Sequence, residues 1–205
     1  MVGLLARAAD AVTSGFCAAG HEIALLGVNS DEIGGSEYLA VVHGRIAGRP
    51  PRLHVERERA VGEACRALAS SRLLASAHDC SEGGLAVALA EACLGGPDPV
   101  GATIDLDAVA AGLRPDLLLF GEAPSRIVVS YAPGDASRVA AIAQQHGAPL
   151  ARLGTVGGGR FVVRGGVEGQ ARQSGLLQGP AVAIDLALDD LANAWRGGFR
   201  RVVGG

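Results

Sequence analysis

Apolar residues along this chain recur with two different spacings, and segments with the two spacings alternate from residue 22 onward. Short runs that are apolar at nearly every position and end at turn residues are typical of buried strands. Such runs cover residues 22–28, 73–78, 100–106 and 126–132. Apolar residues spaced three or four positions apart predict amphipathic helices, which cover residues 54–73, 134–147 and 188–202.

The segments between these elements also carry structural signals. Residues 83–94 are apolar on almost every side, with Glu91 as the single charge, so we expect a helix that is buried on most of its surface. A loop and a short helix follow residue 28, and another short helix and turn cover residues 114–125. Residues 148–166 contain two apolar segments across a glycine turn, which predicts a hairpin. The glycine- and glutamine-rich stretch 165–180 predicts a mobile loop.

Strands of mixed type that alternate with helices predict the α+β class. We expect a layered α/β sandwich with a mixed, largely antiparallel sheet. The chain has 205 residues, enough for one domain with a sizeable core. Residues 22–205 therefore form the predicted domain. Residues 1–21 are rich in small residues and are interpreted as a lead-in without a core of its own.

Composition restricts the classes of function. All 18 basic residues are arginine, which excludes a Schiff-base lysine or a phosphate-loop lysine within this chain. The formal net charge is −3 and arginines do not interleave with aromatics, so no nucleic acid partner is predicted. No signal peptide and no apolar run of membrane-spanning length occurs. We therefore expect a cytoplasmic protein without a membrane partner.

The four cysteines have no metal-binding or redox spacing. They lie in apolar or helical contexts, at Cys17, Cys65, Cys80 and Cys93. We interpret them as small buried hydrophobic residues in a reducing compartment. Cys80 lies inside the most polar motif of the chain, so a reactive thiol at this position is the alternative.

That motif, AHDCSEGG at residues 77–84, places polar groups between a predicted strand and the apolar helix. Gly83 and Gly84 allow the backbone to approach a ligand, and a helix N-terminus favours anions. Asp79 and Glu82 add negative charge, so a bound anion would need a divalent metal or an arginine beside it. A metal–nucleotide complex meets both requirements. The alternative is an ordinary N-cap formed by Ser81 or Asp79.

A second glycine-rich approach to a helix occurs at residues 34–38. Gly35 precedes Ser36 and Glu37, which predicts either a binding loop or a flexible loop capped by Ser36. His78 has no third metal ligand in its sequence neighbourhood, so a structural histidine is the favoured interpretation. Ser81, His78 and Asp79 lie too close in sequence to form a nucleophilic triad.

Three ordered motifs carry a resemblance to a known family. They are LLGVNSDEIGGSEYLAVVHG, AHDCSEGGLAVALAE and LFGEAPSRIVV, followed by a final segment AIDLALDDLANAWRGGFRRVVG. Together they resemble the carboxy-terminal part of phosphoribosylformylglycinamidine synthase, the ATP- and glutamine-dependent enzyme of purine biosynthesis. The resemblance implies the carboxy-terminal domain fold of the AIR synthase-related superfamily.

The resemblance also implies roles for particular residues. That family is internally duplicated, and Asp79 falls where the earlier copy has a magnesium-binding aspartate. Glu122 falls in a substrate-contacting segment, but Ala123 and Pro124 replace the polar residues of the earlier copy. This departure implies a site kept for structure or for an auxiliary nucleotide rather than for turnover. The implied auxiliary nucleotide or substrate site comprises Gly35, Ser36, Glu37, Ser81, Gly83, Gly84, Glu122 and Arg126.

No catalytic residue is assigned, since in the family the catalytic histidine lies upstream. Arg126 beside Glu122 could equally form a partly buried ion pair with it. For the whole enzyme the resemblance implies Mg²⁺ and ATP as cofactors. It implies upstream domains of the same enzyme, a glutaminase subunit and small accessory subunits as partners.

Residues 1–21 then belong to the end of a missing upstream domain, and we expect the isolated chain to be inactive. Two alternatives stay open. One is a related ATP-using enzyme of the aminoimidazole ribonucleotide synthetase, thiamine-monophosphate kinase or selenophosphate synthetase type. The other is a non-catalytic interaction module that docks through residues 83–94.

Overall fold

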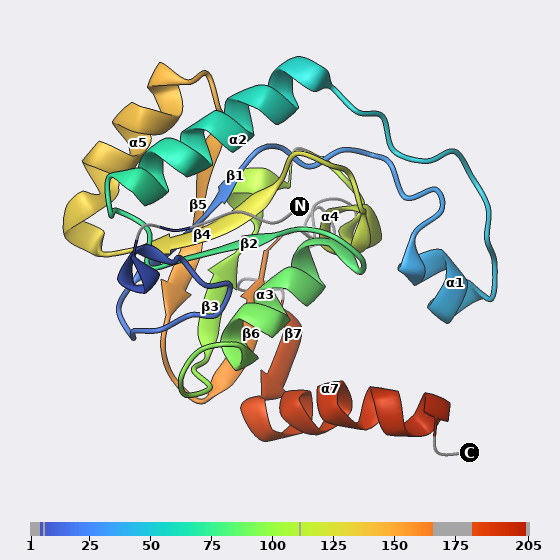
Figure 1. The fold of residues 1–205 in the computed structure, drawn as a ribbon. Coiled ribbons are helices and arrows are strands. Elements are labelled where there is room, and N and C mark those ends of the chain that lie inside the picture. Colours follow the sequence, from blue (N-terminus) through green and yellow to red (C-terminus); the bar gives the residue numbers. More distant parts are fainter. Residues whose placement is uncertain (1–4, 6, 111, 166–181, 204–205) are drawn as a thin grey trace, which may run out of the picture.

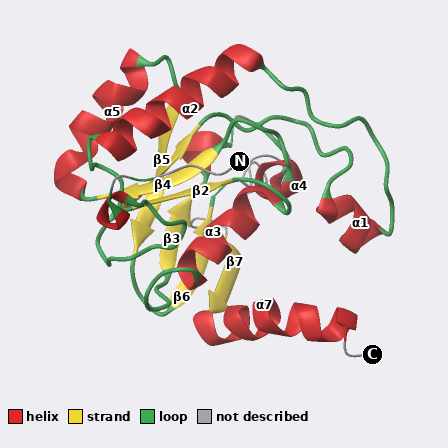
Figure 2. Cartoon of the chain, viewed as in Figure 1, coloured by secondary structure: helices red, strands yellow, loops and turns green. Residues whose placement is uncertain are grey.

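A seven-stranded sheet forms the centre of the computed structural model, which describes residues 5, 7–110, 112–165 and 182–203 (Figures 1 and 2). The order across the sheet is β2-β4-β1-β5-β3-β6-β7. The strands are β1 (Glu22–Leu26), β2 (Ser76–Asp79), β3 (Ala102–Asp105), β4 (Ile127–Tyr131), β5 (Leu150–Val156), β6 (Arg160–Arg164) and β7 (Val182–Ala187).

Six α-helices are labelled among the described residues. They are α1 (Glu37–His43), α2 (Val55–Ser70), α3 (Gly84–Leu94), α4 (Pro115–Phe120), α5 (Ala136–Gln145) and α7 (Leu188–Val203). Short 3₁₀ turns occupy Ala8–Asp10, Asp107–Val109 and Pro133–Asp135. No helix in the described ranges combines the length and the apolar character that a membrane crossing requires.

Alternate residues of the central strand β1 face opposite layers. Ile23 and Leu25 belong to the core cluster that contains the α3 residues Leu85 and Leu89. Ala24 and Leu26 belong to the cluster that contains Val61, Ala64 and Leu68 of α2 and Val139 of α5. Figure 1 shows α2 and α5 side by side on one face of the sheet, with α3 on the other. The period of two in a strand therefore explains why β1 is apolar throughout, because both of its faces are covered.

Strand pairing confirms the predicted fold class. β1 pairs antiparallel with β4 and β5, β2 with β4, β3 with β5, and β6 with β7. Only the pairing of β3 with β6 is parallel among the described strands. The chain is thus α+β, with helices layered on a mixed and largely antiparallel sheet. The apolar character of α3 also agrees with its burial, since seven of its residues are buried.

The expected hairpin over residues 148–166 is wrong. β5 and β6 follow each other in sequence, but β3 lies between them and pairs with both. The backbone of Gly101 explains this insertion: its N–H donates to the Gly158 oxygen at 2.8 Å, and its oxygen accepts from the Gly157 N–H at 2.7 Å. The glycine turn therefore bonds to the start of β3 instead of closing a two-stranded hairpin.

The end of the chain also differs from the prediction. Residues 182–187 form the edge strand β7, which pairs with β6, whereas the sequence pattern did not indicate a strand there. The final helix begins at Leu188, where Leu188 and Leu191 pack against the core. Trp195 is 63% exposed, so it does not continue this packing. The predicted mobile loop at 165–180 lies outside the described residues except for Gly165.

One cysteine expectation is also wrong. Cys17 is exposed, because the adjacent Phe16 fills the core on the α3 side in its place. Cys80 and Cys93 are buried, as expected. Burial raises the pKa of the Cys80 thiol to about 11 and that of Cys93 to about 12, so neither forms much thiolate near neutral pH. The reactive-thiol alternative for Cys80 has no support in this environment.

We expect a thiol-labelling reagent at pH 8 to modify Cys17 in the folded protein, and Cys80 and Cys93 only after unfolding. The raised pKa values and the burial both lower the reactive fraction of these two thiols. Mass spectrometry of peptides after brief labelling measures the sites. In Cys17→Ser the fast-labelled site should disappear, and rapid native labelling of Cys80 would contradict the burial described here.

Gly154 of β5 should not tolerate a side chain. A Cβ atom there would lie 2.0 Å from the Thr103 oxygen of β3, and sheet backbone cannot move away cheaply. We expect Gly154→Ala to lower the free energy of unfolding by about 2 kcal/mol or more, measured by denaturant titration. Gly134→Ala is the matched control because nothing lies within 4 Å of its Cβ position. The control should change stability by less than about 0.5 kcal/mol.

Candidate functional site

One carboxylate oxygen of Glu122 connects the three sequence motifs. Its Oε1 atom accepts hydrogen bonds from the backbone N–H of Glu37 and from that of Gly83, each at 2.8 Å. Glu37 is the first residue of α1, and Gly83 is the N-cap of α3. The structure therefore brings the segments 35–37, 81–84 and 122–126 together, as the combined motifs predict. Glu37 takes part through its backbone, since its side chain is exposed.

The paired glycines at the start of α3 are needed for a steric reason. Gly83 has φ +77° and Gly84 has φ +67°, a left-handed conformation that side chains rarely adopt. A Cβ atom on Gly84 would also lie 2.5 Å from the Gly121 oxygen. The loop that carries Glu122 can therefore approach the start of α3 only because glycine stands there. Gly35, with φ +74°, allows the equivalent turn before α1.

Ser36 acts as a helix cap. Its Oγ atom accepts a hydrogen bond from the Leu39 N–H at 3.4 Å, and the residue is 2% exposed. The capping alternative for Ser36 is therefore confirmed, because its side chain bonds to the first turn of α1. Its neighbour Gly35 is exposed at the surface of the same loop.

Neither Asp79 nor Ser81 caps α3, so that alternative is wrong. The N-cap is Gly83, and no side chain forms a cap hydrogen bond. The Ser81 hydroxyl instead donates to Asp79 Oδ2, and the Asp79 side chain is 74% exposed. Both polar groups are thus exposed at the end of β2 and bonded to each other instead of to the helix.

A cavity of about 370 Å³ lies beside this junction. Asp79, Ser81 and Glu122 line it together with Glu58 of α2 and Ser125. The Ser125 hydroxyl donates to Glu58 Oε2 at 2.6 Å. Glu58 was not among the predicted site residues, because its position in the Glu/Arg run of α2 matches an ordinary solvated helix face. Only the packing of α2 against the 122–126 loop places it here.

Arg126 has a structural position within the site. It is 3% exposed, and its guanidinium donates to the Gly121 oxygen at 2.5 Å, the Ala123 oxygen at 2.9 Å and Asn29 Oδ1 at 2.9 Å. Burial lowers the pKa of Arg126, and the negative charge of Glu122 opposes this effect. The ion pair with Glu122 that the sequence suggested is absent from the ion pairs of the described residues. Arg126 instead fixes the loop that presents Glu122.

Asp79 is the residue of this site that could contribute a carboxylate to a magnesium–nucleotide complex. No group of three histidine, cysteine or acidic side chains in the described ranges could hold a metal ion by itself. Mg²⁺ in nucleotide sites commonly uses one or two protein carboxylates and takes its other ligands from phosphate and water. The exposed Asp79 carboxylate suits such a shared site, whereas it does not suit a metal held by protein alone.

His78 occupies a structural position, as expected. Its Nδ1 atom lies 2.9 Å from the Asp79 backbone oxygen and its Nε2 atom 3.2 Å from Glu91 Oε2 on α3. Both ring nitrogens therefore have partners, and the Nε2 contact links β2 to α3. The hydroxyl of Ser81 bonds to Asp79 instead of His78, which agrees with the absence of a nucleophilic triad.

Comparison with known proteins gives a consistent result. Residues 18–166 match the family described as "AIR synthase related protein, C-terminal domain". The chain is 43% identical over 211 residues to the phosphoribosylformylglycinamidine synthase subunit PurL of Anaeromyxobacter dehalogenans strain 2CP-1. That alignment covers 99% of this chain and 25% of the relative, so the chain spans about a quarter of the length of the curated relatives it matches.

Solved structures share the fold. Thermotoga maritima PurL complexed with FGAR has a TM-score of 0.73 at 22% identity, over 91% of this chain and 30% of that one. Thermotoga maritima PurL complexed with ATP has a TM-score of 0.65 at 20% identity, over 91% of this chain and 28% of that one. The resemblance indicated by the three motifs is therefore confirmed, in sequence by the relative and in fold by these structures.

Replacement of Glu122 by alanine should loosen both helix starts, because it removes the acceptor shared by the Glu37 and Gly83 N–H groups. A hydrogen bond to a charged group contributes about 1.5–3 kcal/mol. We therefore expect amide hydrogen exchange at both positions to accelerate by about tenfold or more, measured by NMR. Glu122→Gln keeps an oxygen acceptor and should have a smaller effect. Unchanged exchange in Glu122→Ala would show that this carboxylate does not hold the loops.

Proposed function

This chain belongs to the family described as "AIR synthase related protein, C-terminal domain". We propose that it is the carboxy-terminal portion of phosphoribosylformylglycinamidine synthase. The proposed whole enzyme converts formylglycinamide ribonucleotide, ATP and glutamine-derived ammonia to the amidine in purine biosynthesis. The observation that carries the proposal is the 43% identity to PurL over 99% of this chain. Residues 1–21 are then the lead-in from an upstream domain, and residues 22–205 form the carboxy-terminal domain.

The proposed contribution of this chain is a scaffold with an auxiliary nucleotide site. Asp79 would share Mg²⁺ with the phosphates of the nucleotide, and Glu122 would hold the backbone around it. Two features support this assignment: the exposed carboxylate of Asp79 at the end of β2, and the fixed approach of the 81–84 segment to Glu122. The bound metal ion would supply the positive charge that brings a phosphate close to these carboxylates.

The proposal assigns no catalytic step to this chain. Glu122 Oε1 already accepts two backbone hydrogen bonds, and Arg126 is buried against carbonyl oxygens. Glu122 Oε1 therefore serves to hold the two loops, and the buried Arg126 guanidinium is not a direct phosphate contact. We infer that the isolated chain is inactive, and that upstream domains, a glutaminase and small accessory subunits complete the enzyme in the cytoplasm.

The test is growth of purine-requiring cells that lack this synthase. This chain is co-expressed with a separately encoded upstream portion of Anaeromyxobacter dehalogenans PurL, and each part is omitted in turn. Growth with both parts together, and with neither alone, is the expected result. If both parts are soluble and associate but growth fails, a diverged relative or a binding module becomes the better interpretation.

Asp79→Asn tests the auxiliary site in the same reconstituted enzyme. Loss of a metal-binding carboxylate should weaken Mg²⁺-dependent nucleotide binding at this site by about tenfold or more, measured by calorimetry. Thermal stability should change little, since the Asp79 side chain is exposed. Asp98→Asn, another exposed aspartate outside the site, is the matched control. Equal nucleotide binding in both variants would remove Asp79 from the metal site.

A further inference from the structure

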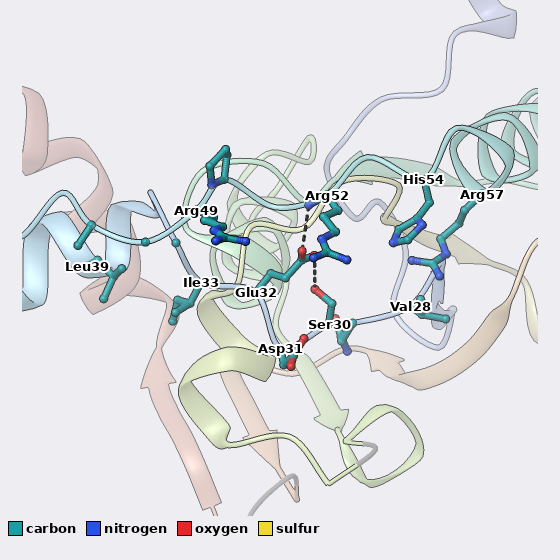
Figure 3. Close-up of a pocket in the computed structure, with 15 residues that line it drawn as sticks. Val28, Ser30, Asp31, Glu32, Ile33, Leu39, Arg49, Arg52, His54 and Arg57 are labelled. Carbon is teal, nitrogen blue, oxygen red and sulfur yellow. Dashed lines mark hydrogen bonds between the residues drawn. The ribbon is translucent and has the colours of Figure 1, made fainter.

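A second and larger cavity lies between the segment that follows β1 and the segment that leads into α2. Its volume is about 940 Å³. Residues 28–34 form one wall and residues 47–57 contribute the other (Figure 3). Figure 3 shows Arg49, Arg52, His54 and Arg57 on the second wall, opposite Ser30 and Val28. None of the predicted site residues lines this cavity.

The two walls are held together by close backbone contacts. The Gly35 N–H donates to the Ala47 oxygen at 2.8 Å. A Cβ atom on Gly34 would lie 2.1 Å from the Arg49 oxygen, so only glycine allows the two segments to approach this closely. The Arg52 N–H donates to Glu32 Oε1 at 3.0 Å. The backbone that carries the arginines is therefore fixed relative to the first wall.

The arginine side chains of this region have no partner among the described residues. None of the five arginines at positions 45, 49, 52, 57 and 59 forms a side-chain hydrogen bond or an ion pair with another described residue. Eight described arginines elsewhere have such contacts, whereas Arg164 and Arg196 do not; the eight are Arg7, Arg66, Arg72, Arg114, Arg126, Arg138, Arg152 and Arg160. Unpaired guanidinium groups are thus concentrated around this cavity, and three of them line it.

The acidic groups of the cavity leave positive charge in excess. Glu32 is already bonded through both oxygens, because Oε2 accepts from the Ser30 hydroxyl at 3.1 Å. Asp31 is the other carboxylate on the lining. Three guanidinium groups against two carboxylates give a net charge of +1 with His54 neutral. Guanidinium groups bind phosphate through paired hydrogen bonds, which makes phosphate a chemically matched ligand.

We propose that this cavity binds a small molecule that carries phosphate groups, with Arg49, Arg52 and Arg57 as its anion contacts. The volume falls in the range of about 300–1,000 Å³ that small-molecule sites occupy. Three guanidinium groups suit a ligand with more than one phosphate, because such a ligand carries more negative charge for them to neutralise. The inference does not rest on the proposed function, since every residue it uses belongs to this cavity and not to the one beside Asp79.

Titration of the full chain with inorganic pyrophosphate in low-salt buffer without metal tests the proposal. Isothermal titration calorimetry should detect saturable binding, and inorganic phosphate should bind more weakly. In the double variant Arg52→Gln/Arg57→Gln we expect affinity for pyrophosphate to fall by about tenfold or more. Arg45→Gln/Arg59→Gln is the matched control, because it removes the same charge from the same segment without altering the cavity lining.

Asp31→Asn tests whether removal of a negative charge from the cavity raises the affinity for pyrophosphate. Removal of this carboxylate from the lining should strengthen pyrophosphate binding by about two- to threefold, an increase that misfolding cannot produce. Circular dichroism and thermal melting verify that all variants fold. If both double arginine variants lost affinity for pyrophosphate equally, net charge alone would explain the effect and the proposal would be overturned. Absence of saturable pyrophosphate binding to the unmodified chain would also overturn it. Neither outcome bears on complementation by the chain, so failure here is separate from failure of the proposed function.

Discussion

The position of Glu122 is the constraint on which the candidate site depends. One carboxylate oxygen receives the first N–H groups of two segments that are far apart in sequence, at the starts of α1 and α3. The loop that carries Glu122 is fixed in turn by the buried guanidinium of Arg126, which bonds to two of its backbone oxygens. Arg126 thus affects the site indirectly, because it holds the backbone of the loop that carries Glu122. Asp79 and Ser81 are the exposed polar residues of the site.

Charge is divided between two neighbouring cavities. Asp79, Glu58 and Glu122 line the smaller one, whereas three unpaired arginines line the larger one. Asn29 connects them, since it lines the larger cavity and its side chain accepts a hydrogen bond from Arg126. The acidic cavity would need a cation before it could accept a phosphate, whereas the basic one could accept a phosphate directly. The two cavities therefore offer different chemistry to ligands of the same class.

The sequence predicted most elements because their signals are local. Apolar runs located β1 and β4, and helical spacing located α2 and α5, since burial on one or two faces leaves a period in the chain. Pairing was less predictable. The turn at Gly157–Gly159 looks like a hairpin, yet β3 enters between β5 and β6 through hydrogen bonds to Gly101. β7 was missed because no turn residue separates it from the helix that begins at Leu188.

The amino-acid sequence by itself determined the fold class, the family and the three motifs that meet at the site, because the signal for each lies in short segments of consecutive residues. Only the tertiary structure decided how those motifs meet. It assigned the cap of α3 to Gly83, placed Arg126 in the interior, and brought Glu58 and the arginines of residues 49–57 to cavity walls. Such contacts depend on the direction in which a side chain leaves its element and on which distant backbone lies opposite. Neither quantity is encoded by the spacing of residues along one segment.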